Sequence, residues 1–267
     1  MVETFSLKDK SFGLWETTSK TPPFWVQYSG LEGCWVYDKK YKHIINAAKY
    51  IENNFNNCGY PPDGDSENNM YLSIIQSYAV KHAIEFSDYI DIIGVECGVS
   101  FGGSSYIELS EMEHQFSLSK ISKYHMHLYD SWSKMRGEDC IYKKEQGNIG
   151  NYDKLDISVV KNNLDKFKDM ITYHKGYIPE ILDSEPNPSY VSFMHIDLNS
   201  AQPTIQVLNK FYPLMTSQGT ILFDDYGGKK YTDTKREVDK FFEDKPGIML
   251  TFTTGQSIYF CNKKGQI

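Results

Sequence analysis

Three aspartates that follow two apolar segments of the sequence form a candidate metal site. Asp197 ends the segment VSFMHID, and Asp224 and Asp225 end GTILFDD. If these segments are neighbouring strands, the three carboxylates meet at one edge of a sheet, where they repel one another unless a cation neutralises them. Oxygen ligands suit Mg²⁺, which lowers the pKa of a bound hydroxyl, and Asp197 could then accept the proton of a substrate hydroxyl. The alternative interpretation is structural, with the same aspartates capping loops and helices.

Three of the histidines on predicted strands are considered as site residues. His195 comes two residues before Asp197 and faces the same side of its strand, which makes it a further site candidate. His125 and His127 alternate along another strand. For these two, packing or hydrogen bonding is favoured over metal binding.

A second chemical feature is the glycine-rich segment IIGVECGVSFGGSS. It runs from an apolar, strand-like stretch into small polar residues that can start a helix, and its candidate ligand contacts are Glu96, Cys97, Gly98, Ser104 and Ser105. Glycine lets the backbone approach a ligand closely, and the N–H groups of a helix start can bind an anionic group. The spacing differs from the dinucleotide fingerprint G-x-G-x-x-G, and a tight turn without a ligand is the structural alternative.

Asp130 indicates which ligand this turn could bind. It closes the next predicted strand, where an acidic side chain can cap the strand end or accept both hydroxyls of a ribose. S-adenosylmethionine fits better than NAD, because Glu96 would repel a pyrophosphate but can meet the ammonium group of methionine. We therefore predict an S-adenosylmethionine site that also includes Ser131, Trp132 and Gly176.

The elements that position these residues alternate between strands and helices from residue 70 onward. This alternation predicts an α/β, Rossmann-like fold, with a mostly parallel sheet of seven strands, helices on both faces and a terminal antiparallel hairpin. Strands are expected at residues 89–95, 125–129, 170–174, 190–196, 220–223, 249–253 and 257–261. Helices are expected at residues 39–55, 70–86, 104–112, 156–167, 200–215 and 233–243, with Asp156 and Ser200 as N-caps and Gly219 just after the fifth helix.

The chain is expected to divide into two parts. Residues 1–69 are rich in aromatic side chains, and their apolar residues follow no regular helix or strand spacing. We therefore interpret them as a lid or dimerisation segment. The loop-like stretch 58–69 separates them from an S-adenosylmethionine-binding domain at residues 70–267. A homodimer or a higher homo-oligomer is expected.

Composition narrows the class of partner. With 40% hydrophobic and 24% charged residues the chain resembles an ordinary soluble protein, and its net charge of −7 argues against nucleic acid as a partner. Five scattered cysteines without a C-x-x-C motif fit a reducing cytoplasm. The first ten residues lack the apolar stretch of a signal peptide, and no run approaches the roughly 20 apolar residues of a membrane span. We expect a cytoplasmic protein that acts on a small molecule or a glycan.

Four motifs in this order resemble the macrocin O-methyltransferase (TylF/MycF-type) family: GVECGVSFGGSS, YDSW, HIDLNSAQPT and GTILFDDYG. The similarity covers roughly residues 70–242. It implies a class I methyltransferase fold, S-adenosylmethionine, and Mg²⁺-dependent methyl transfer to a sugar hydroxyl of a glycan, a nucleotide sugar or a glycosylated natural product. By position, the resemblance makes Asp197, Asp224 and Asp225 metal ligands. It places Glu96, Gly98 and residues 130–132 around the cofactor.

The chain departs from the family pattern at four positions. Asn199 replaces a second aspartate, Ala201 and Gln202 replace a Tyr-Glu pair, and Phe101 replaces an arginine of the turn. These changes leave two alternatives open. One is a catechol-type O-methyltransferase, in which the aspartate pair is normally followed by Asn rather than by Tyr226. The other is a catalytically inactive relative that binds the cofactor, and a dehydrogenase is the least favoured interpretation.

Overall fold

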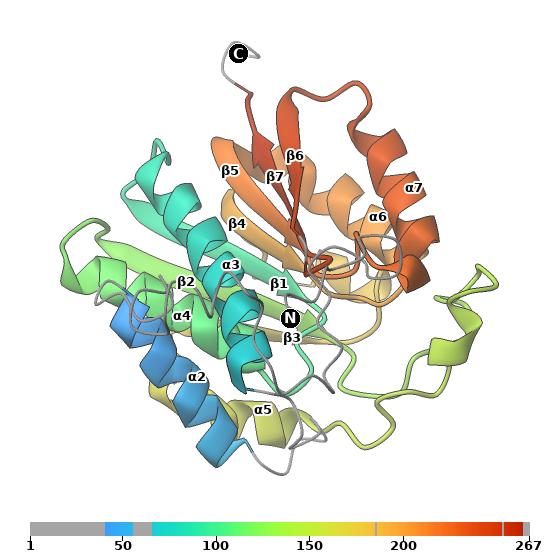
Figure 1. Ribbon diagram of the computed structural model, residues 1–267, viewed down its shortest axis with the longest axis horizontal. Helices are drawn as coiled ribbons and strands as arrows, with labels where there is room; N and C mark the ends of the chain where they lie inside the picture. Colours follow the sequence, from blue (N-terminus) through green and yellow to red (C-terminus); the bar gives the residue numbers. More distant parts are fainter. Residues whose placement is uncertain (1–40, 56–65, 185, 253, 264–267) are drawn as a thin grey trace, which may run out of the picture.

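A seven-stranded sheet in the order β3-β2-β1-β4-β5-β7-β6 organises the chain (Figure 1). The computed structural model describes residues 41–55, 66–184, 186–252 and 254–263. The strands are β1 (Asp91–Cys97), β2 (Lys123–Asp130), β3 (Ile171–Lys175), β4 (Val191–Ile196), β5 (Met215–Phe223), β6 (Gly247–Thr251) and β7 (Ser257–Cys261). The first five are parallel, whereas β7 runs antiparallel to both β5 and β6. The predicted mostly parallel sheet with a terminal hairpin is confirmed.

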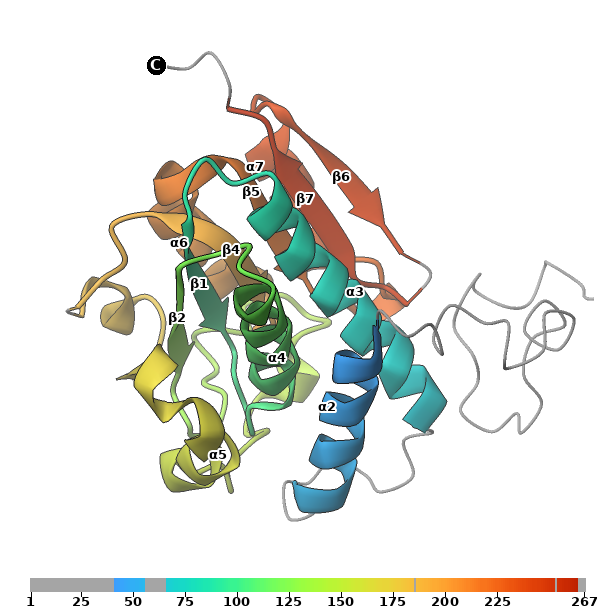
Figure 2. The same cartoon turned by 90° about the vertical axis from the view of Figure 1, so that its left-hand side faces the viewer.

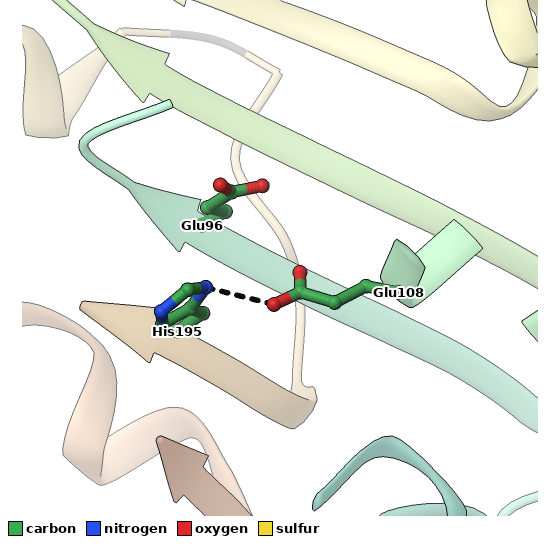
Figure 3. A group of neighbouring side chains, drawn as sticks. All are labelled: Glu96, Glu108 and His195. Atoms are coloured by element: carbon green, nitrogen blue, oxygen red, sulfur yellow. Dashed lines mark ion pairs between the residues drawn. The ribbon is translucent and has the colours of Figure 1, made fainter. Parts of the chain in front are cut away.

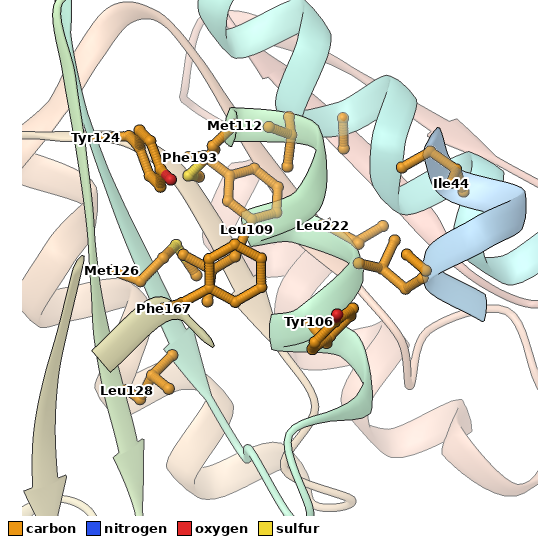
Figure 4. Close-up of a cluster of buried hydrophobic side chains, with 14 of the residues drawn as sticks. Ile44, Tyr106, Leu109, Met112, Tyr124, Met126, Leu128, Phe167, Phe193 and Leu222 are labelled. Atoms are coloured by element: carbon orange, nitrogen blue, oxygen red, sulfur yellow. The ribbon is translucent and has the colours of Figure 1, made fainter. Parts of the chain in front are cut away.

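Helices cover both faces of the sheet (Figures 1 and 2). One core cluster joins α2, α3, α4 and α5 to inward side chains of the strands, such as Met126, Phe193 and Leu222 (Figure 4). Alternate strand residues, such as Val95 and Met194, point to the other face and pack against α6 and α7. This alternation follows from the two-residue period of a strand. The helices are α2 (Lys42–Asn54), α3 (Ser66–Glu85), α4 (Gly103–Ser117), α5 (Ile157–Asn163), α6 (Ala201–Phe211) and α7 (Thr232–Phe242).

The order of the strands reverses at β1. From β1 the chain moves outward through β2 to β3, then returns to pair β4 with the other side of β1. Ligands of open α/β sheets bind at the carboxyl ends of the strands at such a reversal. Here β2 ends at Asp130, and Gly98, Gly176 and Asp197 follow the ends of β1, β3 and β4.

Several predicted boundaries are wrong. The helix expected at 200–215 ends at Phe211, because Pro213 cannot supply the N–H that would continue it. Gly219 therefore lies inside β5, beside an irregularity of the β4–β5 register, where an added Cβ would lie 2.6 Å from Met215 Cε and 3.2 Å from Ser192 O. The helix expected at 156–167 stops at Asn163 and continues as a 3₁₀ helix, although Asp156 caps it as predicted.

The N-terminal segment is described only in part. Its helix α2 contributes Ile44 and Ala47 to the core that α3 and α4 share. The predicted loop at 58–69 is too long, because α3 already begins at Ser66. Residues 1–40 lie outside the described residues, so their role as a lid or dimer contact stays a prediction. No helix within the described residues is both long enough and apolar enough to cross a membrane.

Candidate functional site

Asp197, Asp224 and Asp225 come together at the carboxyl ends of β4 and β5. Each offers a carboxylate oxygen within 4.8 Å of the others. Two main-chain hydrogen bonds continue the sheet beyond its strands: Asp197 N–H donates to Cys97 O at 2.9 Å, and Asp224 N–H donates to Ile196 O at 3.1 Å. These bonds hold both chain segments side by side, so the side chains that follow the strands meet as the sequence predicted.

Asp197 and Asp225 of this cluster hold protons more tightly than isolated carboxylates. Burial, followed by the charges of Asp224 and Asp225, raises the pKa of Asp197 well above its usual value. Burial and the charge of Asp224 raise the pKa of Asp225 to about 7. Three carboxylates whose oxygens lie within 4.8 Å of one another provide a donor set that fits a hard divalent cation such as Mg²⁺.

Asn199 connects this cluster to two tyrosines that the sequence did not single out. Its amide Nδ2 lies 3.4 Å from Asp197 Oδ1 and donates to the Tyr152 hydroxyl at 3.3 Å. The Tyr231 hydroxyl donates to Asn199 Oδ1 at 2.9 Å. Tyr152 and Tyr231 come from loops far away in the sequence, and no spacing rule marks them. In the sequence, only Asn199 marks this region, because the family that the chain resembles has an aspartate at that position.

The glycine turn after β1 lies directly against β4. Gly98 has φ 88°, and an added Cβ there would lie 1.8 Å from Asp197 O. The Asp130 carboxylate holds the turn, because its Oδ2 accepts the N–H groups of Val99 and Ser100 at 2.7 and 2.8 Å. Its Oδ1 accepts the N–H of Trp132 at 2.6 Å. Asp130 therefore shapes the turn itself.

A pocket opens beside the turn and the acidic cluster. Of the predicted cofactor and metal residues, it is lined by Gly98, Asp130, Ser131, Gly176 and Asp197. Tyr152, Tyr177 and Asn199 line it as well. The structure thus brings together, in one hollow, the turn, the end of β2, the end of β3 and the first aspartate of the cluster.

The remaining predicted residues lie behind this hollow. Glu96, Cys97 and Ser105 are fully buried, and Trp132 is 2% exposed. The Trp132 Nε1–H donates to Ser100 O at 3.1 Å, and the Ser104 hydroxyl accepts Gln76 Nε2–H at 2.9 Å. Asp224 and Asp225 flank the pocket without lining it. The cofactor contacts predicted for the buried side chains stay predictions.

His195 lies next to Glu96 but pairs with a residue that the sequence did not indicate. Its Nδ1 lies 2.7 Å from Glu108 Oε1, and both side chains are fully buried (Figure 3). Burial alone would lower the pKa of His195, but the Glu108 carboxylate raises it to about 10. Burial and the charge of Glu108 raise the pKa of Glu96 well above its usual value. Glu108 is an acidic residue of helix α4, and sequence analysis ordinarily assigns acidic residues of a helix to its solvated face.

The other two histidines have structural partners. His125 Nε2 lies 2.8 Å from Thr172 Oγ1, and His127 Nδ1 lies 3.0 Å from His174 Nε2. The predicted hydrogen-bonding role of both side chains is confirmed.

Comparisons with known proteins agree with this geometry. Residues 95–226 match the family model described as a methyltransferase domain. The solved structure of the O-methyltransferase NovP covers 72% of this chain and 80% of its own at a TM-score of 0.60 and 16% identity. A protein from Corynebacterium glutamicum covers 90% of this chain and 98% of its own at a TM-score of 0.50 and 8% identity. No curated protein matches the sequence.

The chain therefore has a Rossmann-like methyltransferase fold, and residues 95–226 resemble a methyltransferase domain. The matched residues begin inside β1 and end at Tyr226, directly after the aspartate pair. They span the glycine turn, Asp130 and the whole acidic cluster.

Proposed function

We propose that the protein is an S-adenosylmethionine-dependent O-methyltransferase that acts on a sugar hydroxyl of a glycan, a nucleotide sugar or a glycosylated natural product. The observation that carries the proposal is the position of the three aspartates beside the pocket that contains Gly98 and Asp130. The resemblance of the four sequence motifs supports the sugar acceptor. NovP, which its structure names an O-methyltransferase, shares the fold.

Residues on one side of the pocket would bind the cofactor, and residues on the other side would bind the metal. On one side, Asp130 fixes the turn in a shape that lets the Gly98 backbone approach S-adenosylmethionine, the donor of the methyl group. On the other side, Asp197, Asp224 and Asp225 would hold Mg²⁺, which lowers the pKa of a coordinated hydroxyl when bound. Methyl transfer is a displacement, so alignment of the two reactants accounts for much of the rate.

Asp197 is the proposed general base. It is the one aspartate of the three that lines the pocket, so a substrate hydroxyl can reach it. The Asn199 amide beside it cannot take up a proton and holds the loop in place instead. We further propose that the enzyme acts in the cytoplasm as a homo-oligomer.

The test measures cofactor binding and metal binding separately. Calorimetric titration of S-adenosylhomocysteine and of Mg²⁺ is carried out on the wild type, Asp224→Asn and the control Asp244→Asn, whose side chain is 83% exposed. We expect all three proteins to bind S-adenosylhomocysteine and only Asp224→Asn to lose Mg²⁺ binding. Methyl transfer to a panel of sugars should then require Mg²⁺ and fail in Asp224→Asn. Absence of S-adenosylhomocysteine binding to the wild type would overturn the proposal.

A further inference from the structure

A second group of potential metal ligands lies behind the pocket, inside the domain. Glu96 comes from β1, Glu108 from α4 and His195 from β4, and all three side chains are fully buried. Figure 3 shows the three side chains converging between the helix and the two strands. One ligand atom of each lies within 4.8 Å of the others. The group shares no residue with the aspartate cluster, which adjoins the open pocket.

The contacts within the domain leave several polar atoms of this group without a partner. The Ser105 hydroxyl donates to Glu96 Oε2, and Glu108 Oε1 approaches His195 Nδ1 at 2.7 Å without the alignment of a hydrogen bond. Among the described residues, Glu96 Oε1, Glu108 Oε2 and His195 Nε2 have no hydrogen-bond partner. Buried polar atoms in native proteins are almost always paired, so an unpaired set of this size indicates that a bound species is missing.

The charges and donor types identify that species. Metal binding displaces the proton of the His195 imidazole, and the two carboxylates then supply two negative charges, which a divalent cation neutralises. All three side chains are fully buried, whereas Mg²⁺ usually keeps several of its water ligands. An imidazole nitrogen beside carboxylate oxygens instead suits zinc, manganese or another first-row transition metal.

We propose that Glu96, Glu108 and His195 hold a buried transition-metal dication of the zinc or manganese type. Because all three side chains are fully buried, no substrate reaches the ion, so its role is structural. It ties α4 to the middle of the sheet directly below the glycine turn. Because the site is enclosed, exchange with solvent is slow, and the metal copurifies with the protein.

Metal content and cobalt spectroscopy test the proposal without any methyl acceptor. The full chain is purified without chelators, and its metals are counted by mass spectrometry. It is then unfolded with a chelator and refolded with Co²⁺, whose visible spectrum and X-ray absorption report nitrogen and oxygen ligands. We expect about one tightly held zinc or manganese ion per chain and, after refolding, one Co²⁺ with one imidazole ligand.

Two variants assign the metal to this group. Glu108→Gln removes one charged ligand and should lose the tightly held ion, whereas Asp224→Asn removes a ligand of the aspartate cluster and should keep this ion. The proposal would be overturned if Glu108→Gln retained the tightly held ion and Asp224→Asn lost it. If Glu108→Gln does not fold, the wild type still decides, because a natively folded wild type without a tight ion, or with Co²⁺ that lacks an imidazole ligand, contradicts the site. Neither result bears on S-adenosylhomocysteine binding, so the proposed function is tested separately.

Discussion

The main-chain N–H of Asn199 donates a hydrogen bond of 2.6 Å to Asp225 Oδ2. This bond joins the loop after β4 to the carboxylate that follows β5, and Asn199 adopts φ 57° to make it. Asparagine tolerates this left-handed conformation better than most residues. The neutral amide of Asn199 places its Nδ2 atom 3.4 Å from Asp197 Oδ1. The macrocin O-methyltransferase family, which the sequence resembles, has a carboxylate at this position. The chain thus keeps the shape of the cluster with one negative charge fewer.

Substituting Asn199 by aspartate should tighten the binding of divalent cations. The variant restores a carboxylate beside Asp197 and also tolerates a positive φ. The added charge increases attraction for Mg²⁺ and repulsion among the aspartates when no cation is bound. We expect a Kd for Mg²⁺ about tenfold lower, which corresponds to about 1.4 kcal/mol, and a lower melting temperature in EDTA. Calorimetry and thermal unfolding measure both.

The control for this change is Asn209→Asp, which adds the same charge at an exposed position of α6. It should leave Mg²⁺ affinity unchanged. Equal Mg²⁺ affinities for Asn199→Asp and the wild type would contradict the metal role of the aspartate cluster.

Gly98→Ala should disrupt the backbone conformation of the glycine turn after β1. An alanine Cβ would lie 1.8 Å from Asp197 O, and φ 88° is unfavourable for any side chain. The backbone must move, so the variant should bind S-adenosylhomocysteine at least about tenfold more weakly or fail to fold. Gly103→Ala is the matched control, because nothing lies within 4 Å of its added Cβ and alanine favours a helix start over glycine. Normal binding by Gly98→Ala would show that the turn does not approach the cofactor.

The sequence predicted the sheet well because its signals are local. Apolar runs such as Tyr89–Val95 and the turn residues between them define strands without reference to the rest of the chain. The aspartates could be placed at one edge for the same reason, since residues that follow parallel strands meet there. Boundaries that depend on distant contacts were wrong, as Gly219 shows: its position in β5 follows from the close approach of Ser192 and Met215.

The side-chain contacts of the site residues could not be predicted from local sequence patterns. Glu108 lies on a helix whose sequence gives no sign that it is fully buried against His195. Tyr152 reaches Asn199 from a loop 47 residues earlier in the chain. These contacts result from tertiary packing, which a periodic pattern does not encode. The buried side chain of Glu96 is a further example, since its position after an apolar run suggested exposure to a ligand.

Acid should destabilise the protein through His127. Burial and the neighbouring His125 and His174 lower the pKa of His127 to about 4, whereas an unfolded histidine titrates near 6.5. Between these values the unfolded chain takes up a proton and the folded chain does not, so stability falls as the pH decreases from about 6.5 to about 4. Urea unfolding at several pH values should show a smaller decrease over this range in His127→Asn. The same slope in both proteins would assign the acid sensitivity to other groups.

Glu145 should stabilise α6 from outside that helix. Ser200 occupies the N-cap position as predicted, but its side chain makes no capping bond, and the Ala201 N–H donates instead to Glu145 Oε1 at 2.8 Å. Glu145 is 2% exposed, and Asn148 of the same loop donates to Asn199 O at 2.8 Å. The carboxylate therefore fastens the loop that carries Tyr152 to the start of α6. Glu145→Ala should cost about 0.5–2 kcal/mol, the usual range for a lost N-cap.

Urea unfolding measures the cost, and limited proteolysis reports whether the loop is released. Glu145→Gln retains an acceptor oxygen and should keep most of the stability and of the protease resistance. Glu138→Ala removes a carboxylate from the same loop whose side chain is 76% exposed, so it should change little. If Glu145→Ala and Glu138→Ala unfold at the same urea concentration, the capping bond does not contribute. Release of the loop without loss of α6 stability would instead show that Glu145 fastens only the loop.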